Sequence, residues 1–114
     1  MTTIYHNPRC SKSRATLALL EEQGVSPVVV LYLETPPDED EIAELTEKLG
    51  LGIREIMRRG EAVYKELDAG NPDHGDDDLI RLVAHNPILL ERPIVVNGDR
   101  AAIGRPPENV LEII

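Results

Sequence analysis

The apolar and polar positions in the first third of the chain follow strand and helix patterns in turn. Residues 3–5 form a short apolar stretch that is typical of a strand, and residues 11–23 carry leucines at helical spacing. Gly24 provides a C-terminal stop for that helix. The run 28–33 is rich in β-branched residues and predicts a buried second strand. The chain therefore begins with a predicted β-α-β unit.

The middle of the chain has only helical patterns. Residues 35–38, Thr-Pro-Pro-Asp, predict a helix start, with a capping hydroxyl at Thr35, proline in the first turn and acidic residues favoured by the helix dipole. This helix runs to Gly50, and a short helix follows around residues 53–57. A further helix begins at the three aspartates 76–78 and ends before a proline.

The remaining pattern is a hairpin followed by a helix. Residues 94–96 and 100–103 flank Asn97-Gly98, a strong hairpin turn signal, and residues 106–114 predict a closing helix. The element order predicts one α/β domain over residues 1–114. Its mixed four-stranded sheet is covered by helices and interrupted by an inserted helical segment. This is the layout of thioredoxin- and glutaredoxin-like folds.

Composition and charge indicate a globular domain and argue against some classes of partner. The chain has 114 residues, of which 41% are hydrophobic and 29% charged, as in an ordinary globular domain. The net charge of −9 argues against nucleic acid or an anionic membrane surface as a partner. No apolar run is long enough to span a bilayer, and no secretory signal is evident. We therefore expect a cytoplasmic protein.

The single cysteine, Cys10, lies just after the first predicted strand and at the start of the first predicted helix. Unpaired backbone N–H groups and the helix dipole stabilise a thiolate there. The cations Arg9, Lys12 and Arg14 are close in sequence, and His6 is nearby. Such surroundings lower a thiol pKa into the range of about 3.5–7.5. The alternative is a buried, inert cysteine, which fits this polar and cationic flank poorly.

The spacing around Cys10 excludes several other sites. A lone cysteine forms neither an internal disulfide nor a multi-cysteine metal site, and we expect no metal. A phosphatase-type loop needs an arginine where Thr16 stands, and a dithiol motif needs a cysteine where Ser13 stands. The Ser13 hydroxyl can donate a hydrogen bond to the thiolate or to a bound anion, or it can cap the helix.

Four segments together resemble a known family. Residues 6–14, His-Asn-Pro-Arg-Cys-Ser-Lys-Ser-Arg, are similar to the active-site segment of the glutaredoxin-coupled arsenate reductases. Residues 31–37, 92–96 and 104–108 are similar to three further segments of that family. The likeness runs in order from residue 4 to residue 114.

The resemblance implies an activity and its partners. In this family the cysteine, here Cys10, attacks the arsenic of arsenate and forms an adduct. Glutathione joins the adduct as thiol co-substrate, glutaredoxin resolves it, and arsenite leaves. No bound cofactor is implied. The external thiols agree with a chain that has only one cysteine.

The same resemblance assigns site residues. His6 matches the histidine that assists thiolate formation, and Pro93 matches the cis-proline of thioredoxin-like folds. The oxyanion-binding arginines match Arg58, Arg92 and Arg105, and fork-shaped donors of fixed charge suit a tetrahedral dianion. Arg54 and Arg59 flank the first of these arginines and leave a one-residue ambiguity, for which the family spacing favours residue 58.

Two alternatives share the fold. One is a transcription regulator that binds RNA polymerase, in which the arginine set would be superfluous. The other is a glutathione-dependent thiol reductase, which explains Cys10 and Ser13 but gives the three arginines no shared purpose.

Overall fold

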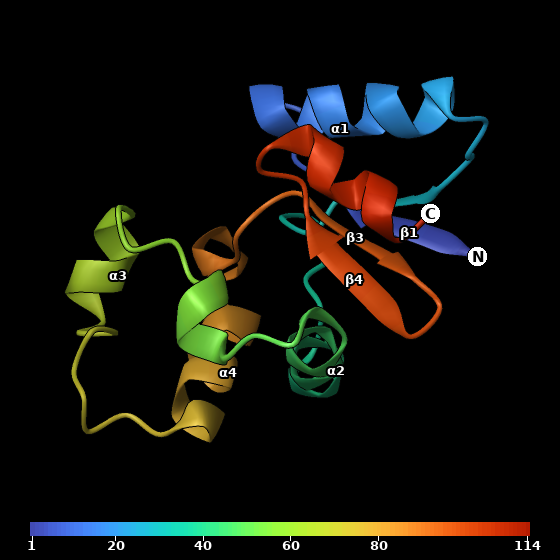
Figure 1. Cartoon of the computed structure of the whole chain (residues 1–114). Helices are drawn as coiled ribbons and strands as arrows, with labels where there is room; N and C mark the ends of the chain where they lie inside the picture. Colours follow the sequence, from blue (N-terminus) through green and yellow to red (C-terminus); the bar gives the residue numbers. More distant parts are fainter. The chain divides into compact units, whose positions relative to one another are not determined.

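A computed structural model describes all residues 1–114, and the chain forms two compact units. Unit 1 consists of residues 1–35 and 92–114, and unit 2 consists of residues 36–91. In Figure 1 unit 1 consists of the blue-to-cyan start of the chain and of its final orange-to-red part, which includes the strands labelled β3 and β4, and unit 2 is the segment between them. That the whole chain acts as one domain remains a prediction.

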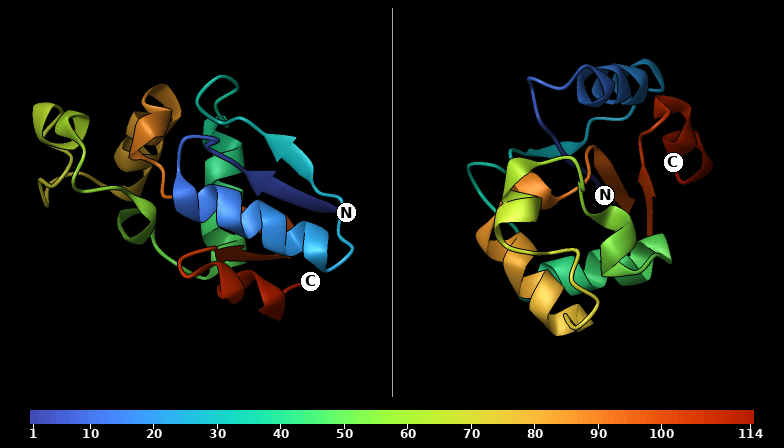
Figure 2. Two further views of the ribbon diagram at one scale, coloured as in Figure 1. Left: turned by 90° about the horizontal axis from the view of Figure 1, so that it is seen from above. Right: turned by 90° about the vertical axis from the view of Figure 1, so that its left-hand side faces the viewer.

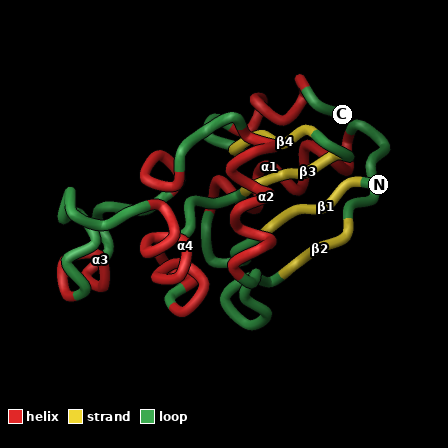
Figure 3. The backbone as a smooth tube through the Cα atoms, turned by 90° about the horizontal axis from the view of Figure 1, so that it is seen from below, coloured by secondary structure: helices red, strands yellow, loops and turns green.

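Unit 1 is built on a mixed sheet of four strands, as the sequence predicted. The strands are β1 (Thr2–Tyr5), β2 (Val28–Val30), β3 (Ile94–Asn97) and β4 (Arg100–Ile103). Their order across the sheet is β2-β1-β3-β4 (Figure 3). β1 is parallel to β2 and antiparallel to β3, and β3 and β4 form the predicted hairpin. This arrangement confirms the thioredoxin-like α/β fold class.

Two helices cover one face of this sheet. α1 (Ser11–Glu22) and the 3₁₀ helix η3 (Pro107–Glu112) lie side by side along it (Figures 1 and 2). They meet the sheet in a buried apolar cluster contributed by β1, α1, β3 and the η3 region: Ile4, Leu20, Val95, Val110 and Ile113. Burial of these aliphatic side chains holds α1 in a fixed position over the sheet.

The second strand differs from its prediction. β2 ends at Val30, because the N–H groups of Glu34 and Thr35 turn back to the carbonyl oxygen of Leu31. It is also not buried: Val28 and Val29 are 47% and 44% exposed. β2 is an edge strand of the sheet and pairs only with β1, so β-branched composition gave the strand correctly but not its burial.

Unit 2 is helical, as expected for the inserted segment. Its elements are α2 (Glu39–Leu49), η1 (Ile53–Ile56), α3 (Ala62–Glu66), α4 (Asp76–His85) and η2 (Pro87–Leu89). α2 and α4 pack against each other, and each has two buried aliphatic residues on its inner face. α3 and η2 were not predicted. α3 has no buried residue, so its sequence lacks the apolar residues at helical spacing from which a helix is predicted.

The start of α2 also differs from its prediction. The N-cap is Asp38 rather than Thr35, and its carboxylate accepts the Glu41 N–H at 2.8 Å. The Glu41 carboxylate in turn accepts the Asp38 N–H and completes a capping box. Residues that precede prolines disfavour helical backbone angles, so the helix begins only after Pro36 and Pro37.

The two units differ in charge. Unit 2 holds 15 of the 21 acidic residues but only 6 of the 12 basic ones, so it carries the whole net charge of −9. Unit 1 is neutral, with 6 residues of each sign. None of the helices has the length and apolar character that crossing a bilayer requires.

Candidate active site

Cys10 lies at the N-cap of α1, where the sequence placed it. Its backbone is extended, and its carbonyl oxygen accepts the first helical hydrogen bond, from Arg14 N–H at 3.0 Å. The preceding turn is closed by Asn7, whose carbonyl oxygen accepts the Cys10 N–H and whose side chain accepts the Arg9 N–H. The thiol therefore faces the unpaired N–H groups of the first turn of the helix.

The surroundings of the thiol lower its pKa overall. Burial is the largest single influence and raises the pKa of Cys10. Four groups outweigh it and bring the pKa below its ordinary value: the Ser13 backbone N–H, the Arg92 charge, the Lys12 backbone N–H and the Arg105 side chain. Nη1 of Arg105 lies 3.8 Å from the sulfur as a hydrogen-bond donor. These are the features of an activated thiol.

The β3–β4 hairpin brings Arg92 and Arg105 to the thiol. Ile94 pairs with Ile103, so these two arginines lie two residues beyond the same end of the hairpin. Ile94 also pairs with Tyr5, so this is the end of β1 from which the chain passes to Cys10. Nη1 of Arg105 donates to the Arg92 carbonyl oxygen at 3.1 Å. The geometry thus groups one thiol and two of the three predicted arginines within unit 1.

Two cis peptide bonds lie next to these arginines. The Arg92–Pro93 bond is cis, at the position that the family resemblance indicated. The Arg105–Pro106 bond is also cis, and nothing in the sequence analysis singled it out.

Gly104 lets α1 come close to this end of the hairpin. Its N–H donates to the Pro93 carbonyl oxygen at 2.9 Å. A Cβ atom at this position would lie 2.4 Å from Oγ1 of Thr16 and 2.8 Å from Cγ of Pro93, which is closer than real contacts allow. Only glycine fits, and the position of the neighbouring Arg105 depends on this contact.

His6 and Ser13 form a buried pair. Their Nδ1 and Oγ atoms are 2.6 Å apart, and Oγ also accepts the Asn7 N–H at 3.0 Å. The direction of the bond between them follows the tautomer of the ring, because the Ser13 oxygen can accept from Nδ1–H or its hydroxyl can donate to Nδ1. The hydroxyl is thus engaged by His6 and Asn7 rather than by the thiol or the helix end. It is the backbone N–H of Ser13 that serves the thiol.

The His6 ring does not contact the thiol by a hydrogen bond. Burial, followed by the positive charge of Arg14, lowers the pKa of His6 from 6.5, so the ring is neutral at neutral pH. It is not among the groups that lower the pKa of Cys10. The structure shows His6 holding Ser13 and the turn before α1, and assistance to thiolate formation stays a prediction.

The three neighbouring arginines of unit 2 have different surroundings. Arg58 is half-buried, and its Nη1 forms an ion pair with Oε1 of Glu61 at 2.5 Å. Arg54 donates to three backbone carbonyl oxygens, those of Ala69, Asn71 and His74. Arg59 is exposed. Arg54 is therefore committed to the fold of unit 2. The Glu61 carboxylate has no signal in the sequence beyond its spacing of three residues from an arginine.

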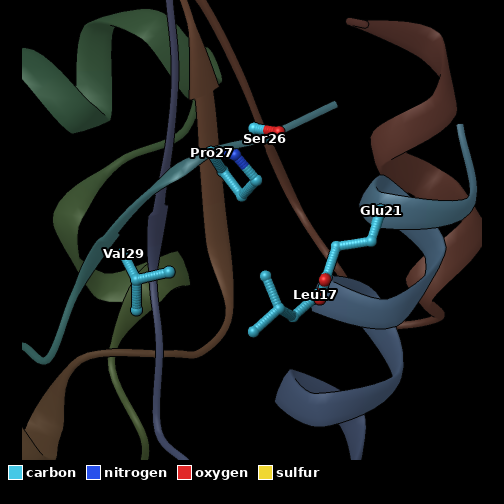
Figure 4. A pocket seen from close by; sticks show the side chains of 5 residues that line it. All are labelled: Leu17, Glu21, Ser26, Pro27 and Val29. Atoms are coloured by element: carbon cyan, nitrogen blue, oxygen red, sulfur yellow. The ribbon is translucent and has the colours of Figure 1, made fainter. Parts of the chain in front are cut away.

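Unit 1 also has a surface pocket that is separate from the predicted site residues. It has a volume of about 350 Å³ and is lined by residues of α1, β2 and the loop between them: Leu17, Glu21, Ser26, Pro27 and Val29. Leu17 and Val29 face each other across it (Figure 4). None of the predicted site residues lines it.

Comparison with known proteins identifies the family. The family model described as the ArsC family matches residues 5–113. This chain belongs to the ArsC family. It is 52% identical over 112 residues to an arsenate reductase of Neisseria meningitidis serogroup B, covering 97% of this chain and 96% of that protein. The resemblance drawn from the four motifs is confirmed.

Two further relatives of this ArsC-family chain cover nearly its whole length. An arsenate reductase structure from Vibrio cholerae superposes with a TM-score of 0.97 at 54% identity, covering 99% of this chain and 97% of that one. An uncharacterized protein of Escherichia coli K12, YfgD, is 55% identical over 112 residues, covering 97% of this chain and 94% of that protein.

Proposed function

We propose that this chain reduces arsenate to arsenite, with Cys10 as the nucleophile. The observation that carries the proposal is a thiol of lowered pKa at a helix N-terminus, with the Arg105 guanidinium 3.8 Å from its sulfur. The arsenate reductases of Neisseria meningitidis and Vibrio cholerae, which match along nearly their full length, support the choice of oxyanion.

The first step is attack on arsenic. The Cys10 thiolate forms an S–As(V) bond, and one arsenate oxygen leaves as water after protonation. Arg92 and Arg105 bind the remaining oxygens, because their planar N–H forks match a tetrahedral anion and keep their charge at any working pH. Arg58 is the third arginine of this set through the family resemblance.

Two external thiols complete the reduction. Glutathione displaces a second oxygen, again as water, and forms an As–S bond of its own. The glutaredoxin thiolate then attacks the glutathione sulfur, and the electron pair of that As–S bond stays on arsenic, which becomes As(III). Water hydrolyses the Cys10–As bond and releases arsenite. We place the reaction in the cytoplasm, where glutathione keeps thiols reduced.

The test compares two reducing systems. Arsenite production should be sustained with arsenate, glutathione and glutaredoxin, and low with thioredoxin and thioredoxin reductase, because this chain has no second cysteine to form an internal disulfide. Cys10→Ser should be inactive in both mixtures. Ready turnover with thioredoxin alone would contradict the glutaredoxin coupling. Absence of turnover in every mixture, with a normally reactive thiol, would favour a thiol reductase or regulator of the same fold.

A further inference from the structure

We propose that Glu61 is an internal competitor for Arg58, which the oxyanion displaces in order to bind, and that Glu61 thereby sets oxyanion affinity. The inference rests on the proposed function, in which Arg58 is an oxyanion ligand. It adds a residue that determines oxyanion affinity and lies outside the four motifs.

The backbone of unit 2 fixes the position of this ion pair. The Arg58 N–H donates to the Leu89 carbonyl oxygen at 2.7 Å, and the preceding Met57 forms a β-bridge with Leu90. Glu61 lies three residues after Arg58, and its N–H donates to the Arg58 carbonyl oxygen across the turn at 3.4 Å. With both backbones held, the carboxylate and the guanidinium stay within reach of each other.

The Glu61 carboxylate is directed to Arg58 and not to the helix that it precedes. Glu61 is the N-cap residue of α3, yet its side chain makes no capping hydrogen bond. Elsewhere in unit 2, at the starts of α2, η1 and α4, an acidic side chain at the third helical position accepts the backbone N–H of the N-cap residue. At α3 the nearest carboxylate forms the ion pair instead, at 2.5 Å from Nη1.

Carboxylate and oxyanion compete for the same donors. A guanidinium binds carboxylate, phosphate and arsenate oxygens through the same planar fork. While Glu61 is bound, the pair has no net charge, so Arg58 adds little to the attraction of a dianion. The two side chains are 25% and 23% exposed, so exchange with an incoming anion does not require the unit to unfold.

Equilibrium binding separates competition from simple positioning. Inorganic arsenate and inorganic phosphate are titrated calorimetrically, without thiols, into wild type, Glu61→Gln, Glu61→Ala, Arg58→Gln and the double variant Glu61→Gln/Arg58→Gln. Glu66→Gln, an exposed site in α3, controls for the loss of one negative charge from the same unit. Partly exposed ion pairs contribute about 0.2–1 kcal/mol, so Kd should fall roughly 1.5- to 5-fold in both Glu61 variants.

The pattern of outcomes decides between the inferences. The fall in Kd should be absent in Glu66→Gln. It should also be absent when Glu61→Gln is combined with Arg58→Gln. Unchanged or weaker binding in both Glu61 variants overturns the competitor role, and weaker binding would make Glu61 a residue that positions Arg58. If the competitor role fails in this way but Arg58→Gln binds the anions more weakly than wild type, Arg58 keeps its place in the proposed function. Unchanged binding in Arg58→Gln removes Arg58 from the oxyanion site, and the Glu61 inference fails with it.

Discussion

At the scale of single residues, the thiol of Cys10 owes its lowered pKa to groups that can be changed one at a time. Arg105→Gln removes a charged donor 3.8 Å from the sulfur and should therefore raise the thiol pKa. The rate of iodoacetamide alkylation against pH should shift its midpoint upward. The matched control is Arg100→Gln in β4, whose guanidinium donates to the Glu112 carbonyl oxygen instead. Equal midpoints in all three proteins would contradict a role for Arg105.

The buried His6 ring should make the protein less stable in acid. Its pKa is lowered in the folded state, so below pH 6.5 the unfolded state binds more protons and stability falls as pH falls. Wild type should lose free energy of unfolding between pH 7.5 and pH 5.5 in urea titrations. His6→Gln should lose less over the same interval.

Comparing the free energies of unfolding of wild type and His6→Gln at pH 7.5 isolates the effects of the substitution that do not depend on protonation of the ring. There the ring is neutral in both states, so any difference between the proteins reports lost packing and the altered bond to Ser13. Parallel pH profiles for wild type and His6→Gln would show that the ring does not couple folding to protons.

Individual site residues were predictable only where the signal is local. Cys10 could be placed at the helix start because a strand, a turn and a helix follow one another directly in residues 2–22. The engagement of the Ser13 hydroxyl by His6 depends on how the turn folds back over α1, which spacing does not reveal. The need for glycine at position 104 arises from a contact with Thr16, 88 residues away in the chain.

At the scale of elements, Arg54 secures the segment after α3. Arg54→Lys keeps the charge but replaces a three-carbonyl fork with a single ammonium group. We expect a loss of about 1–3 kcal/mol in stability and faster hydrogen exchange in residues 67–75. Arg59→Lys, at an exposed neighbouring position, should leave both unchanged. Equal effects of the two substitutions would argue against this role.

Elements were predictable where they bury a regular apolar face. α2 and α4 could be read from aliphatic residues at helical spacing and from acidic first turns. α3 could not, because none of its residues is buried. The exposure of β2 could not be read either, since its edge position follows from the pairing of β1 with β3, which joins distant parts of the chain.

At the scale of the whole molecule, the net charge of −9 resides in unit 2, while unit 1 is neutral. Self-repulsion destabilises a compact unit of high charge, and salt screens it. Raising NaCl from about 10 to about 100 mM shortens the Debye length from about 30 to about 10 Å. Hydrogen-exchange protection should rise in α2 and α4 and change little in the unit 1 sheet. If screening restores about 1 kcal/mol, the thermal midpoint rises by roughly 4–8 °C.

Matched charge removals test this assignment. Glu47→Gln and Glu22→Gln each remove an exposed carboxylate near the C-terminal end of a helix, α2 in unit 2 and α1 in unit 1. Only Glu47→Gln should weaken the salt dependence. The same change in both variants would mean that the charge acts on the chain as a whole.

The contact between Cys10 and Arg105 spans 95 residues of sequence, and β1 pairs with β3 across a similar distance. Closing so long a loop is slow compared with forming the helices of unit 2, whose partners are near in sequence. During synthesis, the thiol therefore lacks the contributions of Arg92 and Arg105 until residues 92–105 have left the ribosome and joined β1. The part of the lowered thiol pKa that comes from these two arginines thus marks the end of folding, and pulse alkylation of a refolding chain would record when the site is completed.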